Sequence, residues 1–403
     1  HPDFCAEMDE TKMTPELYRE SLKLRSQAVW NSFVDMKLVN PSEVKLEVFP
    51  SKNKNYRMRV GFGLYDPLQE DTYADIPEAD RPGELSYVYW YNKRLHVVKK
   101  FPIAHESIVD MMPRLLNVIK QNKMLRAEIR AIKFLVSSTG EMVVTMIYKG
   151  RSLAEAWQGE AKNLRHHLNL TGIVGRSKNV RVVLGRAFVN ETGIKLENGK
   201  NLRYKHVEGS FSNPNLSMAI CTLNWLTSVS KDIASRIKTR PLTLLELYCG
   251  SGNHTVALGD GYFDSVLGVD IDDKLVKAGQ LNLSENKVRG AKIMRMDSQR
   301  FSKSVMARRK HIEVAKSDEK FSKDFKLKDR DADFSAVLVD PPRAGLDSST
   351  RKNIIKYPAI MYVSCNPEAL KRDLVELTKT HRVLRFAFLD HFPYTRHVEC
   401  SVY

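Results

Sequence analysis

LLELYCGSGN, residues 244–253, is an apolar stretch that ends in Gly-x-Gly, as a buried strand followed by a tight turn would. Glycines at this point let the backbone pass close to a ligand, because they carry no side chain. Asp270 closes the next predicted strand, 18 residues after Gly252, where a carboxylate accepts hydrogen bonds from both hydroxyls of a ribose. The third glycine of the dinucleotide fingerprint is missing, and Glu246 precedes the turn. The pattern therefore favours S-adenosylmethionine over NAD, with Gly250, Gly252 and Asp270 as cofactor-binding residues.

Around this stretch, apolar strands alternate with helical segments. Strands are predicted at 243–249, 266–271, 291–296, 336–340, 360–365, 383–389 and 397–403. Helices are predicted at 273–286, 297–310, 349–357 and 367–379. This alternation is typical of an α/β doubly wound, Rossmann-like sheet. The last two strands follow one another without a helix, so we expect a seven-stranded sheet that ends in an antiparallel pair.

The first half of the chain predicts an α+β module. Helices are expected at 14–36, 108–124 and 153–168, with Thr14 as the N-cap of the first and Pro113 near the start of the second. Strands are expected within 44–65, 86–98 and 179–204, and a hairpin within 131–148 that turns at 138–140. We place the domain boundary near residue 205, which gives domains 1–205 and 206–403.

Composition limits the class of protein. The 403 residues are more than one ordinary core holds, so two domains are expected. The net charge of +16 favours a polyanionic partner, although a basic protein without such a partner is also consistent with it. The segment between residues 300 and 331 contains eleven Lys/Arg and six Asp/Glu, which predicts a solvated insertion. No run of 18 apolar residues occurs, so no membrane span is expected.

The cysteines argue against a metal centre. Five of them are scattered along the chain without a C-x-x-C spacing, at positions 5, 221, 249, 365 and 400. This spacing disfavours a disulfide scaffold, a zinc site and an iron–sulfur cluster, and it favours a reducing compartment. No secretory leader is visible, so we expect a cytoplasmic protein, with an organelle as the open alternative.

Two further predicted strands end in residues with reactive side chains, a carboxylate and a thiol. Asp340 is followed by two prolines, which either make a plain structural turn or fix the carboxylate at the carboxyl edge of the sheet. Cys365 ends the fifth strand just before Asn366 and Pro367, a good start for a helix. A helix N-terminus favours a thiolate, although a buried structural cysteine fits the position equally well.

Four stretches together resemble the RNA 5-methyluridine methyltransferase family, and most closely the tRNA (uracil-5-)-methyltransferases that make ribothymidine in the T-loop. They are LLELYCGSGN (244–253), LVDPPRAGLD (338–347), YVSCNPEAL (362–370) and DHFPYTRHVEC (390–400). NYRMRVGF (55–62) and the region 131–157 are similar to the RNA-binding half of the family. The resemblance implies a C-terminal class I methyltransferase domain, an N-terminal RNA-binding domain, and methylation of the uridine at position 54 of tRNA.

The family's chemistry explains the residue types. Carbon 5 of uracil is a poor nucleophile until a thiolate adds at carbon 6, and a base must later remove the proton from carbon 5. By resemblance, Cys365 is the nucleophile and Glu399 the base, although Glu399 alone would be an ordinary strand carboxylate. The target base is expected to flip out of its stack, and no metal is required. The resemblance also implies S-adenosylmethionine as cofactor, the tRNA T-arm as partner and a monomer. The residues that it places around the cofactor are Asn213, Tyr248, Asn253, Asp270 and Asp340.

Two positions depart from the family pattern. The family usually has Gln where this chain has Asn213, whose side chain is one methylene shorter. An aromatic residue is usual where this chain has His254, for which we expect a surface position on a helix. The related rRNA enzymes add a small β-barrel and a four-cysteine iron–sulfur cluster, and neither is visible here, which favours tRNA.

Three alternatives remain open. An rRNA or other RNA uridine carbon-5 methyltransferase would keep the chemistry and change the substrate. An amino-group methyltransferase is compatible with Asp-Pro-Pro but has no need of Cys365 or Glu399. A non-catalytic RNA-binding or RNA-folding module is compatible with the charge and the two-domain layout.

Overall fold

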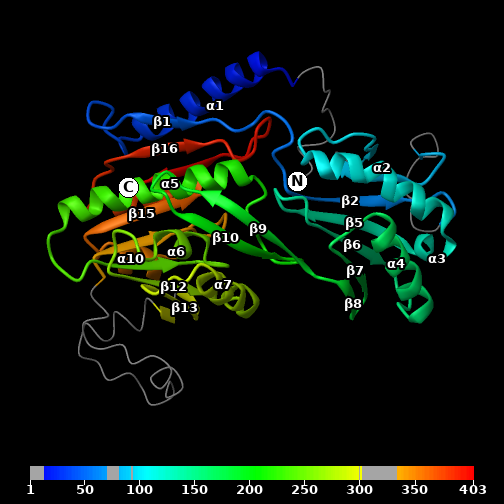
Figure 1. Cartoon of the computed structure of the whole chain (residues 1–403). Helices are drawn as coiled ribbons and strands as arrows, with labels where there is room; N and C mark the ends of the chain where they lie inside the picture. The colour runs from blue at the N-terminus through cyan, green and yellow to red at the C-terminus, as the bar shows by residue number, and fades with distance from the viewer. Residues whose placement is uncertain (1–12, 70–80, 92–93, 299, 302–333) are drawn as a thin grey trace.

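The computed structural model describes residues 13–69, 81–91, 94–298, 300–301 and 334–403 (Figure 1). Cys5, most of the predicted helix 297–310 and nearly all of the basic 300–331 segment lie outside these residues. The described chain contains two large sheets and a separate two-stranded hairpin.

The larger sheet has eight strands in the order β1-β16-β17-β15-β14-β11-β12-β13. Its strands are β1 (Leu46–Phe49), β11 (Thr243–Leu247), β12 (Ser265–Asp270), β13 (Ala291–Arg295), β14 (Ala336–Val339), β15 (Ala359–Ser364), β16 (Phe386–Leu389) and β17 (Glu399–Val402). β17 is antiparallel to both of its neighbours, while the other pairings are parallel. All seven predicted strands are therefore confirmed, and so is the doubly wound, Rossmann-like class with its antiparallel end pair.

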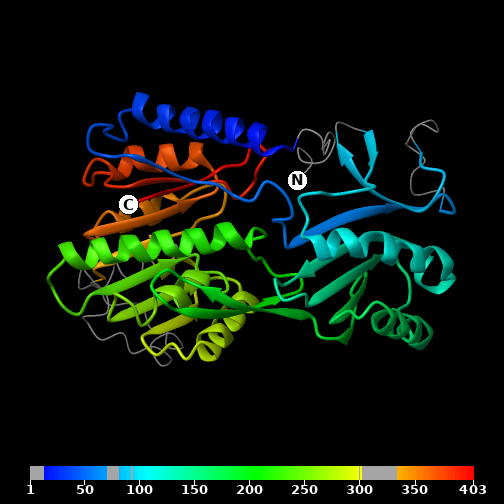
Figure 2. The same cartoon turned by 45° about the horizontal axis from the view of Figure 1, so that its top comes forward.

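Helices cover both faces of this sheet, and its inner strands are buried on both sides, as parallel sheets require. One face packs against α5 (Leu216–Arg236), α6 (Asn253–Leu258) and α7 (Asp273–Glu285). The other packs against α1 (Pro15–Asp35), α10 (Ser348–Ile354) and α11 (Pro367–Leu377). Figures 1 and 2 show α5 running alongside the strands of the sheet.

The first segment of the chain belongs to this sheet. α1 begins after Thr14, whose hydroxyl accepts from the Leu17 N–H at 3.3 Å, so the predicted cap is confirmed. Trp30 and Phe33 of α1 pack edge-on against Phe386 of β16, with ring centroids 5.4 and 4.9 Å apart. β1, which lies within the predicted strand region 44–65, then adds an eighth strand beside β16, and the sequence did not predict its place in this sheet. A boundary near residue 205 stays a prediction, and it would assign α1 and β1 to the other half of the chain.

The second sheet has seven strands in the order β4-β3-β2-β5-β6-β7-β8. They are β2 (Arg59–Tyr65), β3 (Ser86–Tyr91), β4 (Arg94–Val97), β5 (Ile129–Val136), β6 (Met142–Tyr148), β7 (Gly172–Ser177) and β8 (Val180–Gly185). The predicted hairpin is confirmed as β5 and β6, which pair antiparallel. The helices of this half are α2 (Glu106–Gln121), α3 (Lys123–Arg126) and α4 (Glu155–His167).

The predicted position of Pro113 is wrong. Pro113 lies in the interior of α2, because the helix begins earlier, where His105 accepts from the Ser107 N–H at 3.4 Å. Histidine is not among the preferred capping residues, so the sequence did not reveal this start.

The hairpin of β9 (Phe188–Lys195) and β10 (Asn201–Val207) lies between the two sheets (Figures 1 and 2). On one side, Glu191 accepts from the Ser138 N–H at 2.8 Å, in the turn between β5 and β6. On the other, the Tyr204 hydroxyl donates to the Asn253 carbonyl oxygen at 2.8 Å. The hairpin therefore links the seven-stranded sheet to the Gly-x-Gly turn beside the larger sheet.

Candidate active site

The predicted site residues gather at one edge of the larger sheet. Parallel strands present their carboxyl ends at the same edge, and ligands bind there in open α/β sheets. β17 runs antiparallel, so its first residue reaches this edge as well. The residues that follow or close these strands are Tyr248, Gly250 and Gly252 after β11, Asp270 on β12, Asp340 after β14, Cys365 after β15, and Glu399 on β17.

Cys365 and Glu399 are neighbours across two strands. The register between β15 and β17 pairs Ser364 with Cys400, and Cys365 and Glu399 are the next residues on either strand. Directly opposite residues of an antiparallel pair have Cβ atoms about 5 Å apart. Cys365 is partly exposed and is a free cysteine, while the side chain of Glu399 is 13% exposed. The Cys365 thiol and the Glu399 carboxylate therefore lie next to each other, partly buried, at the edge of the sheet.

The charge around the Cys365 thiol differs from the sequence expectation. Asn366 caps α11 as predicted, accepting from the Glu368 N–H at 3.1 Å. However, burial and the carboxylates of Glu399 and Asp340 raise the pKa of Cys365 to about 11, and Arg343 offsets this only in part. The expectation of a thiolate favoured by the helix N-terminus is wrong for the protein alone, because desolvation and two nearby acids outweigh the helix end.

The turn after β11 has the backbone of a ligand-binding loop. Gly250 and Gly252 both adopt positive φ, at 53° and 76°. At Gly252 a side chain would be strained by this φ, and its Cβ would lie 2.4 Å from the Ile293 Cδ1 atom, so glycine is favoured there, whereas the space beside Gly250 is open. The two carboxylate oxygens of Asp270 each accept one backbone N–H, from Gly250 and Asp272, at 2.9 Å. Each oxygen keeps a second lone pair for a ligand hydroxyl.

Asn253 and Asp340 add polar groups whose state fits a bound nucleoside cofactor. The Asn253 Oδ1 atom is buried and has no hydrogen-bond partner among the described residues. Burial, together with Glu399 and Glu246, raises the pKa of Asp340 to about 7, against the opposing charges of His254 and His391. An unpaired buried acceptor and a carboxyl close to neutrality are costly without a polar ligand. The residues present therefore fit S-adenosylmethionine, which offers hydroxyl and ammonium donors.

The expected surface position of His254 is wrong. The imidazole Nδ1 atom lies 3.3 Å from the Oε1 atom of Glu246, which is fully buried in β11 and also accepts from the Thr255 hydroxyl. Burial lowers the pKa of His254, but the hydrogen bond and the charge of Glu246 outweigh this, so the pKa is raised. An acid within an apolar strand needs a partner, and this need was the available clue.

His391 is a site residue that the sequence did not single out. Its Nδ1 atom lies 2.9 Å from the Asn213 Nδ2 atom, and its Nε2 atom lies 3.0 Å from both the Thr222 hydroxyl and the Glu399 Oε2 atom. The side chain of His391 therefore lies between Asn213 and the predicted base, Glu399. The assignment of Asn213 to the cofactor stays a prediction.

Arg59, the first residue of β2, brings the seven-stranded sheet to the same region, next to Phe211. The Arg59 guanidinium lies 5.5 Å from the centre of the Phe211 ring and donates to the Ser210 carbonyl oxygen at 2.8 Å. Phe211 is 69% exposed and is two residues from Asn213. An exposed aromatic ring stacked on arginine is a surface on which a nucleobase can stack.

Among the described residues, no group of three metal-ligating side chains occurs. The described helices also include none that is both long and apolar enough to cross a membrane. Neither observation conflicts with the site built above.

Known proteins show where this chain belongs. Residues 20–403 match the tRNA (Uracil-5-)-methyltransferase family. A tRNA/tmRNA (uracil-C(5))-methyltransferase of Saccharophagus degradans is 36% identical over 391 residues, 96% of each chain, and one of Vibrio parahaemolyticus is 34% identical over 97% of each. The Pyrococcus abyssi tRNA (uracil-54, C5)-methyltransferase, solved with S-adenosyl-L-homocysteine, has the same fold at 19% identity, with a TM-score of 0.65 over 97% of this chain and 85% of that one. The match over nearly the whole chain confirms the resemblance seen in the four motifs: this chain belongs to the tRNA (uracil-5-)-methyltransferase family.

Proposed function

We propose that this protein methylates carbon 5 of the T-loop uridine at position 54 of tRNA, with Cys365 as nucleophile and Glu399 as base. Its family makes it an S-adenosylmethionine-dependent tRNA (uracil-5-)-methyltransferase. The uridine position and the residue roles are the proposal. The observation that carries it is the adjacency of Cys365 and Glu399 across β15 and β17.

The first step of the proposed reaction belongs to Cys365. Its thiolate forms a bond from Sγ to carbon 6 of the uracil, and the electron pair of the ring double bond moves to carbon 5 and the neighbouring carbonyl. S-adenosylmethionine, when bound, supplies an electrophilic methyl group and a positive charge at its sulfur. Carbon 5 then carries both the new methyl group and its original proton.

The second step belongs to Glu399. The carboxylate takes the proton from carbon 5, the ring double bond forms again, and the bond from carbon 6 to Cys365 breaks. Cys365 leaves as a thiolate and Glu399 as a carboxylic acid, which returns its proton to water. The half-buried position of Glu399 suits this role, because a base shielded from water acts on the substrate it faces.

The raised pKa of Cys365 sets a condition on the first step. Because burial and the carboxylates of Glu399 and Asp340 raise the pKa, the thiolate forms when positive charge offsets these effects. Arg343 supplies part of this charge within the chain. We therefore propose that the nucleophile is activated only in the loaded active site, so that an empty enzyme is protected from side reactions.

Seven residues are proposed to hold the cofactor. Asp270 accepts from the ribose hydroxyls, the loop at Gly250 and Gly252 lets the backbone approach, and Asp340 and Asn253 accept from polar hydrogens. Asn213 and Tyr248 complete the set through the family resemblance.

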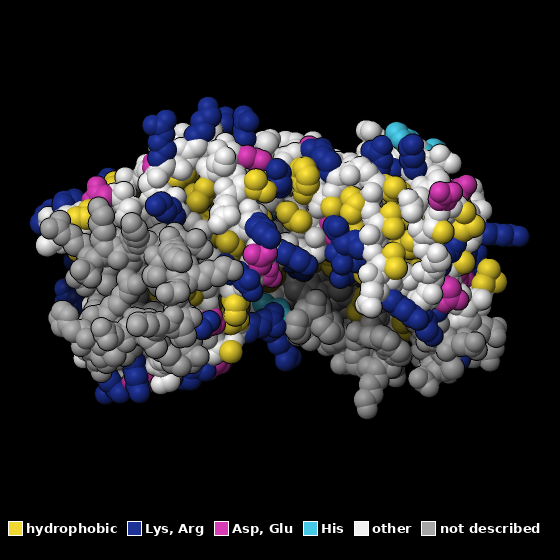
Figure 3. Space-filling model, turned by 90° about the horizontal axis from the view of Figure 1, so that it is seen from below, with side chains coloured by type: hydrophobic (Ala, Val, Ile, Leu, Met, Phe, Trp, Pro, Cys, Tyr) yellow, Lys and Arg dark blue, Asp and Glu magenta, His cyan; other side chains and the backbone are white. Residues whose placement is uncertain are grey.

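We propose that the tRNA lies across both halves of the chain. Lys and Arg side chains are spread along the face seen in Figure 3, over both halves, and phosphate contacts of this kind weaken steeply with salt. Arg59 and Phe211 lie where a flipped or neighbouring base of the T-arm would stack. The protein is proposed to act as a monomer in the cytoplasm, and its free Cys221, Cys249, Cys365 and Cys400 suit a reducing compartment.

The test uses an unmodified tRNA transcript and methyl-labelled S-adenosylmethionine, followed by nucleoside analysis and mapping. We expect label in 5-methyluridine at the T-loop, and none in a matched transcript whose T-loop uridine is replaced by cytidine. Label in 5-methyluridine with rRNA alone would keep the chemistry and overturn the substrate. Label in a methylated adenine or cytosine would overturn the roles of Cys365 and Glu399.

A further inference from the structure

His391 joins three parts of the active site. It follows β16, it contacts the start of α5 through Thr222, and it faces Glu399 on β17. Its side chain is fully buried, so each polar partner that it has matters to its orientation. None of the reaction steps described above uses it.

The hydrogen bonds of its neighbours decide which nitrogen of His391 carries the proton. Two atoms of Asn213 lie within reach of the His391 Nδ1 atom: Nδ2 at 2.9 Å, and Oδ1 at 3.2 Å, which already accepts from the Asn215 N–H at 3.0 Å. With the amide N–H as the nearer partner, Nδ1 is assigned as the acceptor and the ring proton is on Nε2. This assignment follows from the pattern of partners around the ring.

The protonated nitrogen faces two oxygens. The Thr222 hydroxyl donates to the Met218 carbonyl oxygen at 2.9 Å, so its oxygen is free to accept from Nε2–H at 3.0 Å. The Oε2 atom of Glu399 lies 3.0 Å from the same nitrogen. The Nε2–H group therefore has the threonine oxygen and the carboxylate at the same distance.

We propose that His391 is a positioning residue for Glu399: through Nε2–H it holds the carboxylate in place for removal of the carbon 5 proton. This inference rests on the proposed function of Glu399. A base removes a proton efficiently only when it is held within hydrogen-bond reach of it, so a donor that fixes the carboxylate serves this step. His391 gives up no proton in this scheme, because Glu399 takes the proton from carbon 5 and releases it to water.

The imidazole is not needed to anchor the loop that carries it. The backbone of His391 is tied down independently, since its carbonyl oxygen accepts from the Asn215 Nδ2 atom at 3.1 Å. The preceding residue, Asp390, is buried and pairs with Arg25 of α1 at 2.9 Å. The loop therefore has its own anchors, and the polar atoms of the His391 side chain lie against Asn213, Thr222 and Glu399.

Other charged groups face Glu399 from the neighbouring elements. His254 approaches from α6, Asp340 from the end of β14 and Cys365 from the end of β15, and each interacts electrostatically with Glu399. The Nε2 atom of His391 lies 3.0 Å from the Oε2 atom of Glu399. Loss of this donor is therefore expected to slow proton removal, because the carboxylate is no longer held toward carbon 5.

The experiment separates methyl transfer from proton removal. Single turnovers are followed with methyl-labelled S-adenosylmethionine and a tRNA transcript that carries tritium at carbon 5 of its uridines. His391→Leu removes the donor and His391→Gln keeps an N–H near the position of Nε2. In His391→Leu we expect methyl transfer within roughly 3-fold of the wild type, but tritium release slowed roughly 10- to 100-fold with a covalent protein–RNA adduct accumulating. His391→Gln should release tritium at close to the wild-type rate.

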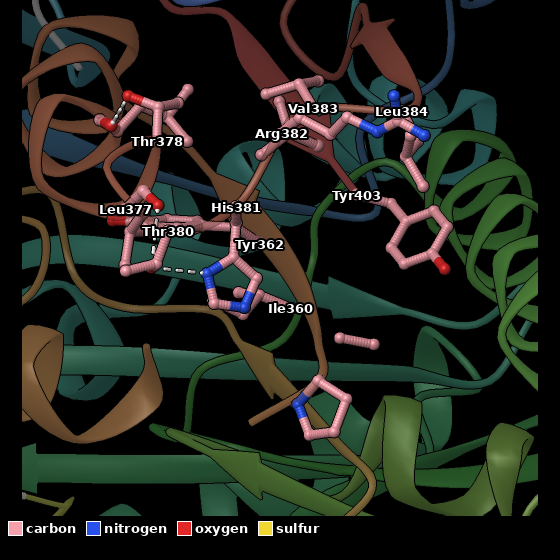
Figure 4. Close-up of a pocket in the computed structure, with 14 residues that line it drawn as sticks. Ile360, Tyr362, Leu377, Thr378, Thr380, His381, Arg382, Val383, Leu384 and Tyr403 are labelled. Atoms are coloured by element: carbon pink, nitrogen blue, oxygen red, sulfur yellow. Dashed lines mark hydrogen bonds between the residues drawn. The ribbon is translucent and has the colours of Figure 1, made fainter. Parts of the chain in front are cut away.

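His381→Leu is the matched control. It replaces a histidine of the loop between α11 and β16, near the start of β15, in the pocket of about 240 Å³ shown in Figure 4, where its Nε2 atom lies 2.9 Å from the Tyr357 carbonyl oxygen. Both steps should match the wild type there. The inference is overturned if tritium release keeps pace with methyl transfer in His391→Leu, or if both steps fall together in His391→Leu and His391→Gln. A wild type that makes no 5-methyluridine would instead overturn the proposed function.

Discussion

Cys365 lies opposite Glu399 across two neighbouring antiparallel strands. Cys365 follows Ser364, Glu399 precedes Cys400, and Ser364 and Cys400 are paired. The adjacency of Cys365 and Glu399 depends on β17 running against its neighbours, because only an antiparallel strand brings its first residue to the edge where the parallel strands end. The strand pair at the end of the chain is thus what places a base beside the nucleophile.

Cys365→Ser should abolish methylation while leaving tRNA binding within about 3-fold of the wild type. The hydroxyl keeps the size of the side chain but is a far weaker nucleophile at neutral pH. The rate is measured with methyl-labelled cofactor and the affinity by filter binding at fixed salt. Turnover above about one thousandth of the wild-type rate would remove Cys365 from the mechanism.

Asp270→Asn should weaken cofactor binding by roughly 10-fold or more, because an amide offers one acceptor oxygen where the carboxylate offers two. The matched control is Asp272→Asn, two residues away, where the carboxylate caps α7 by accepting from the Lys274 N–H at 2.8 Å and asparagine caps equally well. Calorimetric titration with S-adenosylhomocysteine measures both variants. Equal losses in the two would count against the ribose contact.

Asp340→Asn should become more stable relative to the wild type as the pH rises. The pKa of Asp340 is raised to about 7 from 3.8, so the folded protein binds this proton more tightly than the unfolded chain. The stabilisation is complete below pH 3.8 and is lost as the pH rises to 7. The free energy of unfolding of Asp340→Asn, measured in urea and taken relative to that of the wild type, should rise by on the order of 2 kcal/mol between pH 5 and pH 8.

Asp347→Asn is the control for that experiment. Hydrogen bonds from Ser349 and Thr350 outweigh burial and lower the pKa of Asp347 to about 2, so its stabilisation is present above pH 3.8 and is lost only as the pH falls to about 2. The difference between this variant and the wild type should therefore be the same at pH 5 and pH 8. A parallel change in both variants would contradict the account of Asp340.

Gly175→Ala tests the packing of the first half. A Cβ there would lie 2.4 Å from the Cη2 atom of Trp157, which is buried, so we expect a loss of about 2 kcal/mol in the free energy of unfolding. Gly159→Ala in α4 meets nothing within 4 Å and should instead gain about 0.5–1 kcal/mol. Urea denaturation of both variants compares them directly.

The edge of the sheet could be predicted from the sequence because local patterns encode it. Each strand there is an apolar run, and each of Gly252, Asp270, Asp340 and Cys365 follows or closes such a run. The helix α5 was missed although Asn215 caps it, accepting from the Met218 N–H at 3.3 Å, and the short strand β7 was missed as well.

The contacts that the sequence did not reveal are long-range. β1 has only four residues, and its partner β16 lies more than 300 residues further along the chain. His391 meets Asn213 and Thr222 only because β16 ends beside the start of α5, and no local spacing encodes that contact. His254 was assigned to the surface because its partner Glu246 lies in a different element.

The most direct test of the central claim is the covalent state of a Glu399→Gln variant. Incubated with unmodified tRNA and S-adenosylmethionine, it should add Cys365 to the uracil and transfer the methyl group, but it should fail to remove the carbon 5 proton. A slow-migrating protein–RNA band on a denaturing gel is therefore predicted, and it should be absent from the double variant Cys365→Ala/Glu399→Gln. A Glu399→Gln enzyme that turns over at the wild-type rate without this band, or a band that persists without Cys365, would contradict the assignment of nucleophile and base.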